Sequence, residues 1–287
     1  MKFLNRPFLF FLYSNLFIAV CAVIMAWQTC TLLLHQSLSL DLAGFIFFGT
    51  LTSYSFHWML TPADNSASSR TAWQQQFRWF HTVLLVISVG ATAFFLLPLL
   101  DHWPLLLFTA VITFLYSAPK IPHPLFGILK KVALGKTLFL AIVWMHVTTL
   151  LPLLVSDQSW QPSFGWFAAS RFFLIYAICI LFDRRDRESD IALGIRSLIT
   201  RLSEGSIRFL FFISLAFFFI STIALYFHQI TPIVIAILLI PGLILVPLYR
   251  YAIHKGGDIF YYFVLDGFMA LSSLLTLIPG IIDSAKS

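Results

Sequence analysis

Eight consecutive residues, 183–190, hold the densest group of charges in a chain in which only 10% of residues are charged. This 183–190 cluster contains four carboxylates and three guanidinium groups, and it directly follows an apolar run over 172–182. Carboxylates beside membrane-like sequence are costly to place, so they are candidates for function by default. Paired carboxylates at a helix end predict a site for a cation and, through it, for an anionic substrate.

Asp186 and Asp190 are four residues apart, so on a helix their carboxylates lie on one face. Two neighbouring carboxylates repel each other unless they share a cation, and Mg²⁺ binds carboxylate and phosphate oxygens together. The alternative is a salt-bridged helix end, because Arg184, Arg185 and Arg187 are close enough to neutralise the acids. The spacing alone leaves both interpretations open.

The rest of the chain indicates where such a site would lie. Of its 287 residues 60% are hydrophobic, and the mean hydropathy is +0.91, whereas soluble domains are about 45–50% apolar. A membrane span needs about 20 mainly apolar residues. We therefore expect one integral membrane domain over 1–287, an all-α polytopic helix bundle of about nine transmembrane helices. The apolar stretches lie at 8–34, 41–61, 79–100, 103–118, 132–155, 163–183, 207–228, 230–249 and 258–281.

The basic residues are distributed unevenly between these stretches. With the N-terminus in the cytoplasm, 16 of the 18 Lys and Arg residues fall on the cytoplasmic side, and only Arg171 and Lys286 fall outside. Basic residues concentrate in cytoplasmic loops, so we expect the N-terminus inside and the C-terminus outside. The charge of +6 then requires no nucleic acid. We expect Arg171 to extend to the outer membrane interface.

Several segments resemble the UbiA superfamily of intramembrane prenyltransferases. Residues 186–190 and 194–197, at the inner end of the sixth stretch, are similar to the second aspartate-rich motif of that family, and 182–186 resembles the approach to it. Leu115-Tyr116-Ser117-Ala118-Pro119 before a basic loop, with Lys136 and Trp144 after it, also resembles the family. The resemblance covers essentially the whole chain.

The resemblance implies a helical bundle around a cavity that opens to lipid, in a membrane such as the bacterial inner membrane. Two aspartate-rich motifs would hold Mg²⁺, which binds the diphosphate of an isoprenyl donor. Departure of the diphosphate leaves an allylic cation, which a lipophilic, aromatic acceptor attacks, and the apolar cavity excludes water. The implied partners are an isoprenyl diphosphate, the acceptor and membrane lipid, with no protein partner.

The resemblance also implies roles for individual residues. Asp186 and Asp190 would hold Mg²⁺ and act in catalysis, with Asp183 supporting them. Lys136 and Arg196 would bind the phosphates, although the cytoplasmic excess of basic residues explains such charges equally well.

The first motif of the family, N-x-x-x-D-x-x-x-D, is expected at the inner end of the second stretch. The same spacing falls here on Ser53, His57 and Thr61, and no carboxylate occupies it. Asp64 lies further on, beyond Pro62, which is expected to end the helix. One interpretation is a single Mg²⁺ at the second motif, with basic residues neutralising the remaining phosphate charge. In another, His57 replaces a ligand or acts as a base, although a lone membrane histidine is commonly a packing residue.

Asp266 is the clearest ionisable residue inside an apolar stretch, about 12 Å deeper than Asp258 along a helix. We expect it either to line the cavity and supply negative charge, or to bond a neighbouring helix. The leading prediction for function is Mg²⁺-assisted transfer of an isoprenyl group to a lipophilic acceptor. The alternative is a non-catalytic lipid-binding or carrier relative that has lost the first metal motif.

Overall fold

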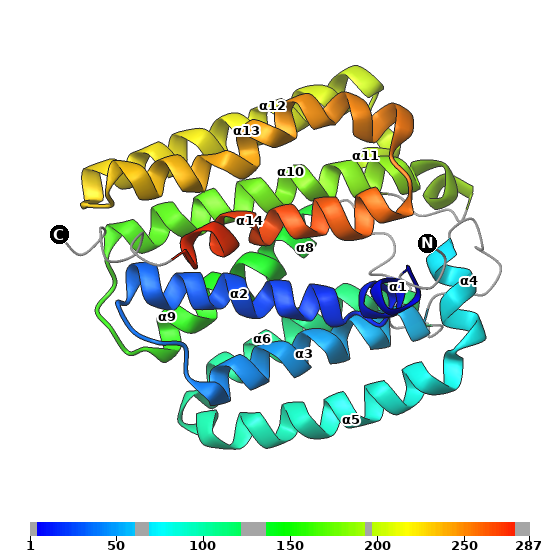
Figure 1. Cartoon of the computed structure of the whole chain (residues 1–287), viewed down its shortest axis with the longest axis horizontal. Helices are drawn as coiled ribbons and strands as arrows, with labels where there is room; N and C mark the ends of the chain where they lie inside the picture. The colour runs from blue at the N-terminus through cyan, green and yellow to red at the C-terminus, as the bar shows by residue number, and fades with distance from the viewer. Residues whose placement is uncertain (1–4, 61–68, 122–135, 193–196, 279–287) are drawn as a thin grey trace.

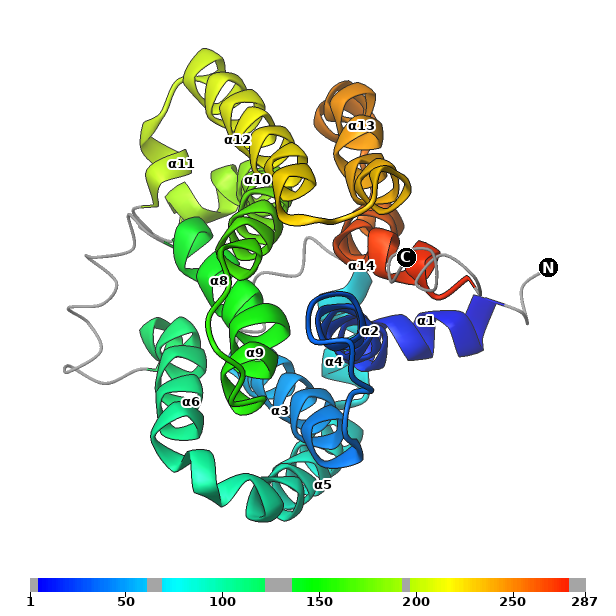
Figure 2. The same cartoon turned by 90° about the vertical axis from the view of Figure 1, so that its left-hand side faces the viewer.

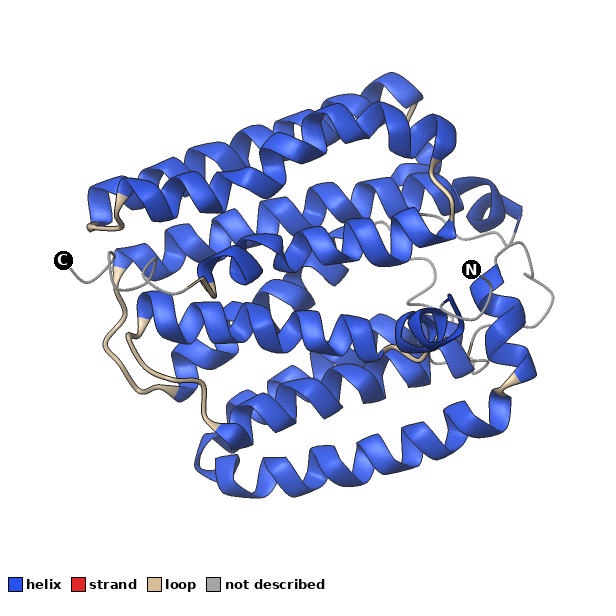
Figure 3. Cartoon of the chain, viewed as in Figure 1, coloured by secondary structure: helices blue, strands red, loops and turns tan. Residues whose placement is uncertain are grey.

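The computed structural model describes residues 5–60, 69–121, 136–192 and 197–278. Over these residues the chain folds into helices joined by short loops, with no strand (Figure 3). The main helices lie side by side along the long axis of the molecule (Figure 1). Lipid offers the backbone no hydrogen-bond partners, so a spanning segment must satisfy its own polar groups, as a helix does. The predicted all-α membrane bundle is confirmed.

One end of the bundle, called the basic end below, carries many of the basic residues. It consists of α4 (Ser69–Gln76), α11 (Leu198–Arg201) and the last turns of α10 (Pro162–Ala192) and α13 (Pro232–Lys255) (Figure 1). The 183–190 cluster lies at this end because it forms the last turns of α10. That this end faces the cytoplasm stays a prediction.

The first apolar stretch forms two helices rather than the single predicted span. α1 (Asn5–Tyr13) and α2 (Leu16–Leu33) are separated at Asn15, whose backbone is left-handed with φ 68°. Asparagine visits this conformation more readily than most residues. The buried Asn15 amide donates to Ser55 Oγ at 3.3 Å, and its oxygen accepts a hydrogen bond from Arg70. These distant partners fix the break.

Helix α10 forms the centre of the fold. Every residue from 174 to 181 is buried, as expected for a helix that is apolar on all sides. In Figure 2, α10 lies between α8 (Lys136–Met145) and α12 (Glu204–Ala224). α3 (Leu40–Met59) and α14 (Asp266–Thr276) complete the core with α2. The core therefore holds α10 in place up to the residue at which the 183–190 cluster begins.

Among the described residues, six helical segments are long and apolar enough to cross a membrane. One of them, Arg78–Ser117, has 40 residues, about twice the length of a single crossing. It comprises α5 (Arg78–Leu96) and α6 (Trp103–Ser117), joined by the 3₁₀ turn η1 (Leu97–His102). The last apolar helix, Phe260–Thr276, is shorter. The predicted number of nine spans is not established by these lengths and stays a prediction.

The peripheral helices expose large apolar side chains. Phe94 of α5 is 66% exposed and Phe209 of α12 is 67% exposed. Contiguous apolar surface of this kind is rare on soluble monomers, and it fits contact with lipid. The remaining short elements include two π-helical segments, a type of element frequent at functional sites. They are η2 (Ala118–Lys120), η4 (His146–Leu150, π), α9 (Leu151–Val155), η5 (Leu225–His228) and η6 (Phe260–Leu265, π).

Arg171 lies inside the bundle, so the prediction that it extends to the outer interface is wrong. Only 6% of its surface is exposed. Its guanidinium donates to the Met25 carbonyl at 2.9 Å and to Gln28 Oε1 at 2.6 Å. Ser273 donates to the same Gln28 oxygen at 2.8 Å. Polar partners on α2 and α14 hold the side chain inside, and they are far from it in the sequence.

We expect Arg171→Met to lower the thermal unfolding midpoint of the detergent-solubilised protein by about 5–10 °C. The variant loses two hydrogen bonds from a charged donor, each worth about 1.5–3 kcal/mol. Circular dichroism melting measures the midpoint. Arg201→Met removes the same charge from an exposed position on α11 and should change it little. Equal midpoints for the two variants would contradict a structural role for Arg171.

Candidate functional site

The three aspartates of the 183–190 cluster extend from one continuous helix, α10. Asp183 is buried and accepts a hydrogen bond from Thr137 Oγ1, in the first turn of α8. The contact joins α8 to α10 at the level where the charged residues begin. Asp183 therefore lies in the packing between two helices, which suits the supporting role predicted for it.

Asp186 and Asp190 lie one turn apart on α10 but in different surroundings. Asp190 is 6% exposed, whereas the side chain of Asp186 is 40% exposed. Arg185 donates to both oxygens of Asp186, from Nε at 2.7 Å and from Nη2 at 3.3 Å. The salt-bridge interpretation thus applies to Asp186. The helical spacing predicted for the two carboxylates is present.

The two other arginines of the cluster bind an acid on the next helix. Arg184 Nε lies 2.9 Å from Glu204 Oε2, and Arg187 Nη1 lies 3.0 Å from Glu204 Oε1. Arg187 also donates to the Leu202 carbonyl at 2.9 Å. These contacts brace the end of α10 against the start of α12. They are half-exposed ion pairs, which contribute about 0–1 kcal/mol each.

His57 of α3 packs against the end of α6. Its Nδ1 lies 3.2 Å from Ser117 Oγ, and its ring stacks on Tyr116 with a centroid separation of 4.8 Å. This arrangement matches the packing role described above for a lone membrane histidine. Ser53 lies one turn earlier on α3. The roles predicted for His57 as a ligand or base stay predictions.

Several predicted residues lie at the limits of the structure. Lys136 is the first residue of α8, next to the Thr137 that contacts Asp183. Thr61, Asp64 and Arg196 lie outside the described residues.

Two arginines and three aromatic residues meet at the basic end and are called the arginine–aromatic cluster below: Trp58, Arg70, Arg185, Tyr261 and Tyr262. Arg70 lies between two rings, with its Cζ 4.4 Å from the centroids of both Trp58 and Tyr262. Arg185 Cζ lies 4.5 Å from the Tyr261 centroid and 4.9 Å from the Tyr262 centroid. Four elements supply these side chains, namely α3, α4, α10 and η6.

Both guanidinium groups of this cluster keep a buried N–H without an acceptor among the described residues. Arg70 is 4% exposed and donates to Asn15, while its Nε has no such partner. Arg185 donates to the Tyr262 hydroxyl at 3.1 Å, while its Nη1 has none. A buried donor left unpaired costs about 1–3 kcal/mol. Burial lowers the pKa of Arg70, and Tyr262 and Asp266 oppose that shift by favouring its charged form.

Asp266 lies where η6 meets α14, and it joins this group electrostatically. It lies near enough to Arg70 and Arg185 to interact with their charges. It is only partly buried, as is Tyr54 on the neighbouring α3. Both roles expected for Asp266, in the site and in a bond to a neighbouring helix, stay predictions.

An apolar groove opens beside the arginine–aromatic cluster. Its volume is about 980 Å³, large enough for a lipophilic ligand. Tyr13 and Trp73 line it and also pack in one apolar group with Trp58 and Tyr262 of the cluster. The other lining residues come mainly from α1, α4, the end of α13 and η6: Leu9, Ala72, Gln76, Tyr251, Lys255, Gly257, Asp258, Ile259, Phe260 and Val264.

A comparison with protein families identifies the family of the chain. Residues 64–274 match the model of the UbiA prenyltransferase family, well over half of the chain. The chain belongs to the UbiA prenyltransferase family. No curated protein and no solved structure matches it.

The UbiA match includes the second acidic motif but begins after α3. It therefore contains Arg70, Asp186, Asp190 and Asp266, while His57 precedes it. This boundary agrees with the missing carboxylates on α3. Enzymes of the UbiA family use Mg²⁺, which their aspartate-rich motifs bind.

The described residues do not fit two Mg²⁺ ions. No group of three or more His, Cys, Asp or Glu side chains that could hold a metal occurs among them. They do fit one ion that is bound by Asp186 and Asp190, because Mg²⁺ is commonly held by one or two carboxylates together with substrate phosphates and water. Binding would require Asp186 to exchange part of its contact with Arg185.

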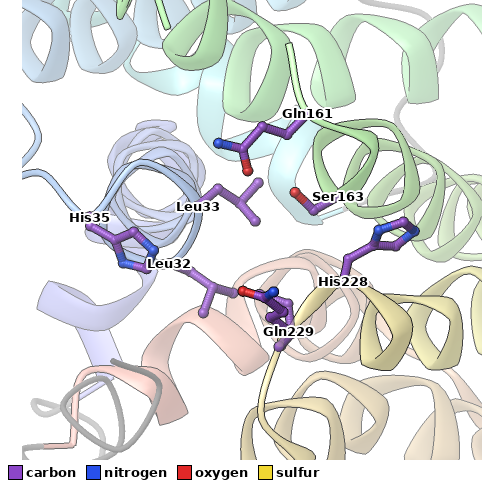
Figure 4. A pocket seen from close by; sticks show the side chains of 8 residues that line it. Leu32, Leu33, His35, Gln161, Ser163, His228 and Gln229 are labelled. Atoms are coloured by element: carbon purple, nitrogen blue, oxygen red, sulfur yellow. The ribbon is translucent and has the colours of Figure 1, made fainter. Parts of the chain in front are cut away.

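A second cavity, of about 330 Å³, lies at the opposite end of the bundle and belongs to no predicted site (Figure 4). Gln161, Ser163, His228 and Gln229 form its polar wall, and His35 lies across from them. The cavity is remote from the aspartates on the last turns of α10. It therefore has no part in the chemistry considered below.

The arginine–aromatic cluster was not predicted from the sequence. Arg70 was explained by the cytoplasmic excess of basic residues, and Arg185 by its acidic neighbours. The one local signal was a pair of tyrosines, Tyr261 and Tyr262, one turn before the ionisable Asp266. Polar and aromatic residues at that spacing share a helix face.

Proposed function

We propose that this UbiA family member transfers an isoprenyl group from an isoprenyl diphosphate to a lipophilic, aromatic acceptor. The proposal is carried by one juxtaposition. An apolar groove of about 980 Å³ is lined by Tyr13 and Trp73, which pack with the rings that contact Arg70 and Arg185. A lipid diphosphate needs both kinds of surface, because its chain is apolar and its head is strongly anionic.

We assign the head of the donor to the basic end of the bundle. Asp186 and Asp190 would hold one Mg²⁺, which would neutralise charge on the departing diphosphate. Asp183 positions α10 through its bond with Thr137. Lys136 and Arg196 are proposed to contact the phosphate oxygens, and Lys136 precedes the residue that bonds Asp183.

Aromatic side chains would stabilise the reacting carbon. When the C–O bond to the diphosphate breaks, the diphosphate keeps the electron pair and an allylic cation remains. Ring faces attract cations, and a dry cavity prevents water from attacking it. We assign this role to Tyr54 and Trp144, which are joined by a hydrogen bond from Trp144 Nε1 to the Tyr54 hydroxyl at 3.0 Å. The acceptor carbon then bonds the cation and loses a proton.

A second function, non-catalytic binding of a lipid or isoprenyl diphosphate, is favoured by two specific observations. His57 packs on Tyr116 and Ser117 in the region where the first acidic motif is expected. Asp186 has both oxygens bonded to Arg185. In a carrier of this kind the anion would be held without C–O bond cleavage.

Turnover distinguishes the two functions. We expect the purified protein to release diphosphate from radiolabelled isoprenyl diphosphates in the presence of membrane lipid extract, and to do so faster with Mg²⁺ than with EDTA. Thin-layer chromatography should show the label in a lipid product. The test uses donors of several chain lengths. Folded protein that releases no diphosphate from any of them would contradict the transferase proposal and support the carrier.

A further inference from the structure

The arginine–aromatic cluster holds two like charges around one ring. The Cζ atoms of Arg70 and Arg185 lie 4.4 and 4.9 Å from the Tyr262 centroid. Cation–π contact attracts each guanidinium to the ring but does not remove the repulsion between them. An anion bound near them would offset this repulsion.

The unpaired hydrogen-bond donors of this cluster suit an acceptor-rich anion. Arg70 Nε and Arg185 Nη1 are buried and have no acceptor in the described part of the chain. Arginine donors match phosphate oxygens in charge and geometry. A phosphate group carries several acceptor oxygens, so one ligand could satisfy both donors.

The charges around the site leave it cationic, and one edge of it is accessible to solvent. Lys120 Nζ lies 5.7 Å from the Trp58 ring that also contacts Arg70. The nearby described acids are Asp186, bonded to Arg185, and Asp266, which acts on both arginines. Arg185, Asp186 and Asp266 keep accessible surface, so an anion can approach from their side.

We propose that Arg70 and Arg185 bind the phosphate groups of an isoprenyl diphosphate without a divalent cation, in place of the acidic motif that α3 lacks. The inference rests on the proposed function for the identity of the donor, but it concerns binding rather than turnover. The neighbouring apolar groove offers a place for the isoprenyl chain. The same guanidinium chemistry would accept the phosphate of a membrane lipid, so the test includes both sources.

Equilibrium dialysis of the detergent-solubilised protein in EDTA tests the proposal, with radiolabelled farnesyl thiolodiphosphate as the probe. We expect the probe to bind without Mg²⁺, and Arg70→Met and Arg185→Gln each to weaken binding at least about tenfold. Arg201→Met, which removes an exposed arginine at the same end, should change binding less than about twofold. Arg185→Gln keeps the test valid if Arg70→Met does not fold, as judged by its melting curve.

Competition identifies the source of the phosphate. Inorganic pyrophosphate should displace the probe, whereas phosphatidylglycerol in mixed micelles should not. Displacement by the phospholipid alone would overturn the diphosphate assignment. Absence of binding in EDTA, or equal affinities for the Arg70, Arg185 and Arg201 variants, would overturn the proposal even if turnover with Mg²⁺ were found. Metal-free binding without turnover would support it and contradict only the transferase.

Discussion

Asp186→Ala and Asp190→Ala should each lower kcat/KM for diphosphate release by about a hundredfold or more. This loss is larger than the one usually seen when a residue that only hydrogen-bonds to a metal ligand is replaced. In the proposed site both carboxylates would be needed to hold one Mg²⁺, because α3 offers none at Ser53 or His57. A C–O bond that leaves negative charge on the diphosphate breaks slowly when that charge is not neutralised. Release of labelled diphosphate from an isoprenyl donor, with Mg²⁺ present, measures the effect.

Glu188→Ala is the matched control for these two variants. Glu188 is exposed and lies on the same turns of α10, so its loss changes the net charge equally. The control should keep nearly full turnover. The Asp186–Arg185 pair is partly exposed, and such pairs add about 0–1 kcal/mol, so melting curves of Asp186→Ala should change little. Turnover that is unchanged in both aspartate variants would remove these residues from the mechanism.

The fold was largely predictable because a bilayer allows few solutions. Apolar stretches of sufficient length must become helices to satisfy their backbone, and most described residues of these stretches are helical. The break at Asn15 was not predictable, since it depends on bonds to Ser55 and Arg70. The burial of Arg171 depends in the same way on Gln28, which precedes it by more than 140 residues.

Only the part of the candidate site that lies within one short segment of the sequence could be predicted. Asp186 and Asp190 could be recognised because their spacing and surroundings lie within one helix. The arginine–aromatic cluster joins Trp58, Arg70 and Tyr262 from three elements, and no periodicity connects them. The excess of basic residues in cytoplasmic loops accounts for the presence of Arg70. It does not indicate that aromatic rings contact this arginine. Tertiary packing therefore decides which basic residues belong to the site.

Asp266→Asn should have effects of opposite sign on stability and on anion binding. The Asp266 carboxylate lies near enough to Arg70 and Arg185 to interact with their charges. Asparagine is neutral, so less negative charge would offset the two guanidinium groups near Tyr262. Loss of a negative charge near two cations destabilises them, and we expect a fall in the melting midpoint. We also expect affinity for farnesyl thiolodiphosphate in EDTA to rise about tenfold, or 1.4 kcal/mol, because an anion no longer competes with the carboxylate.

Asp157→Asn supplies the control, because Asp157 is exposed and asparagine tolerates its left-handed backbone. It should change neither the melting midpoint nor the affinity. Saturating thiolodiphosphate should also restore part of the midpoint lost in Asp266→Asn, since a ligand that binds only the folded state stabilises it. A purely structural carboxylate would lower the midpoint and leave affinity unchanged or weaker. Tighter binding in a less stable protein is therefore the combination that places Asp266 beside the anion.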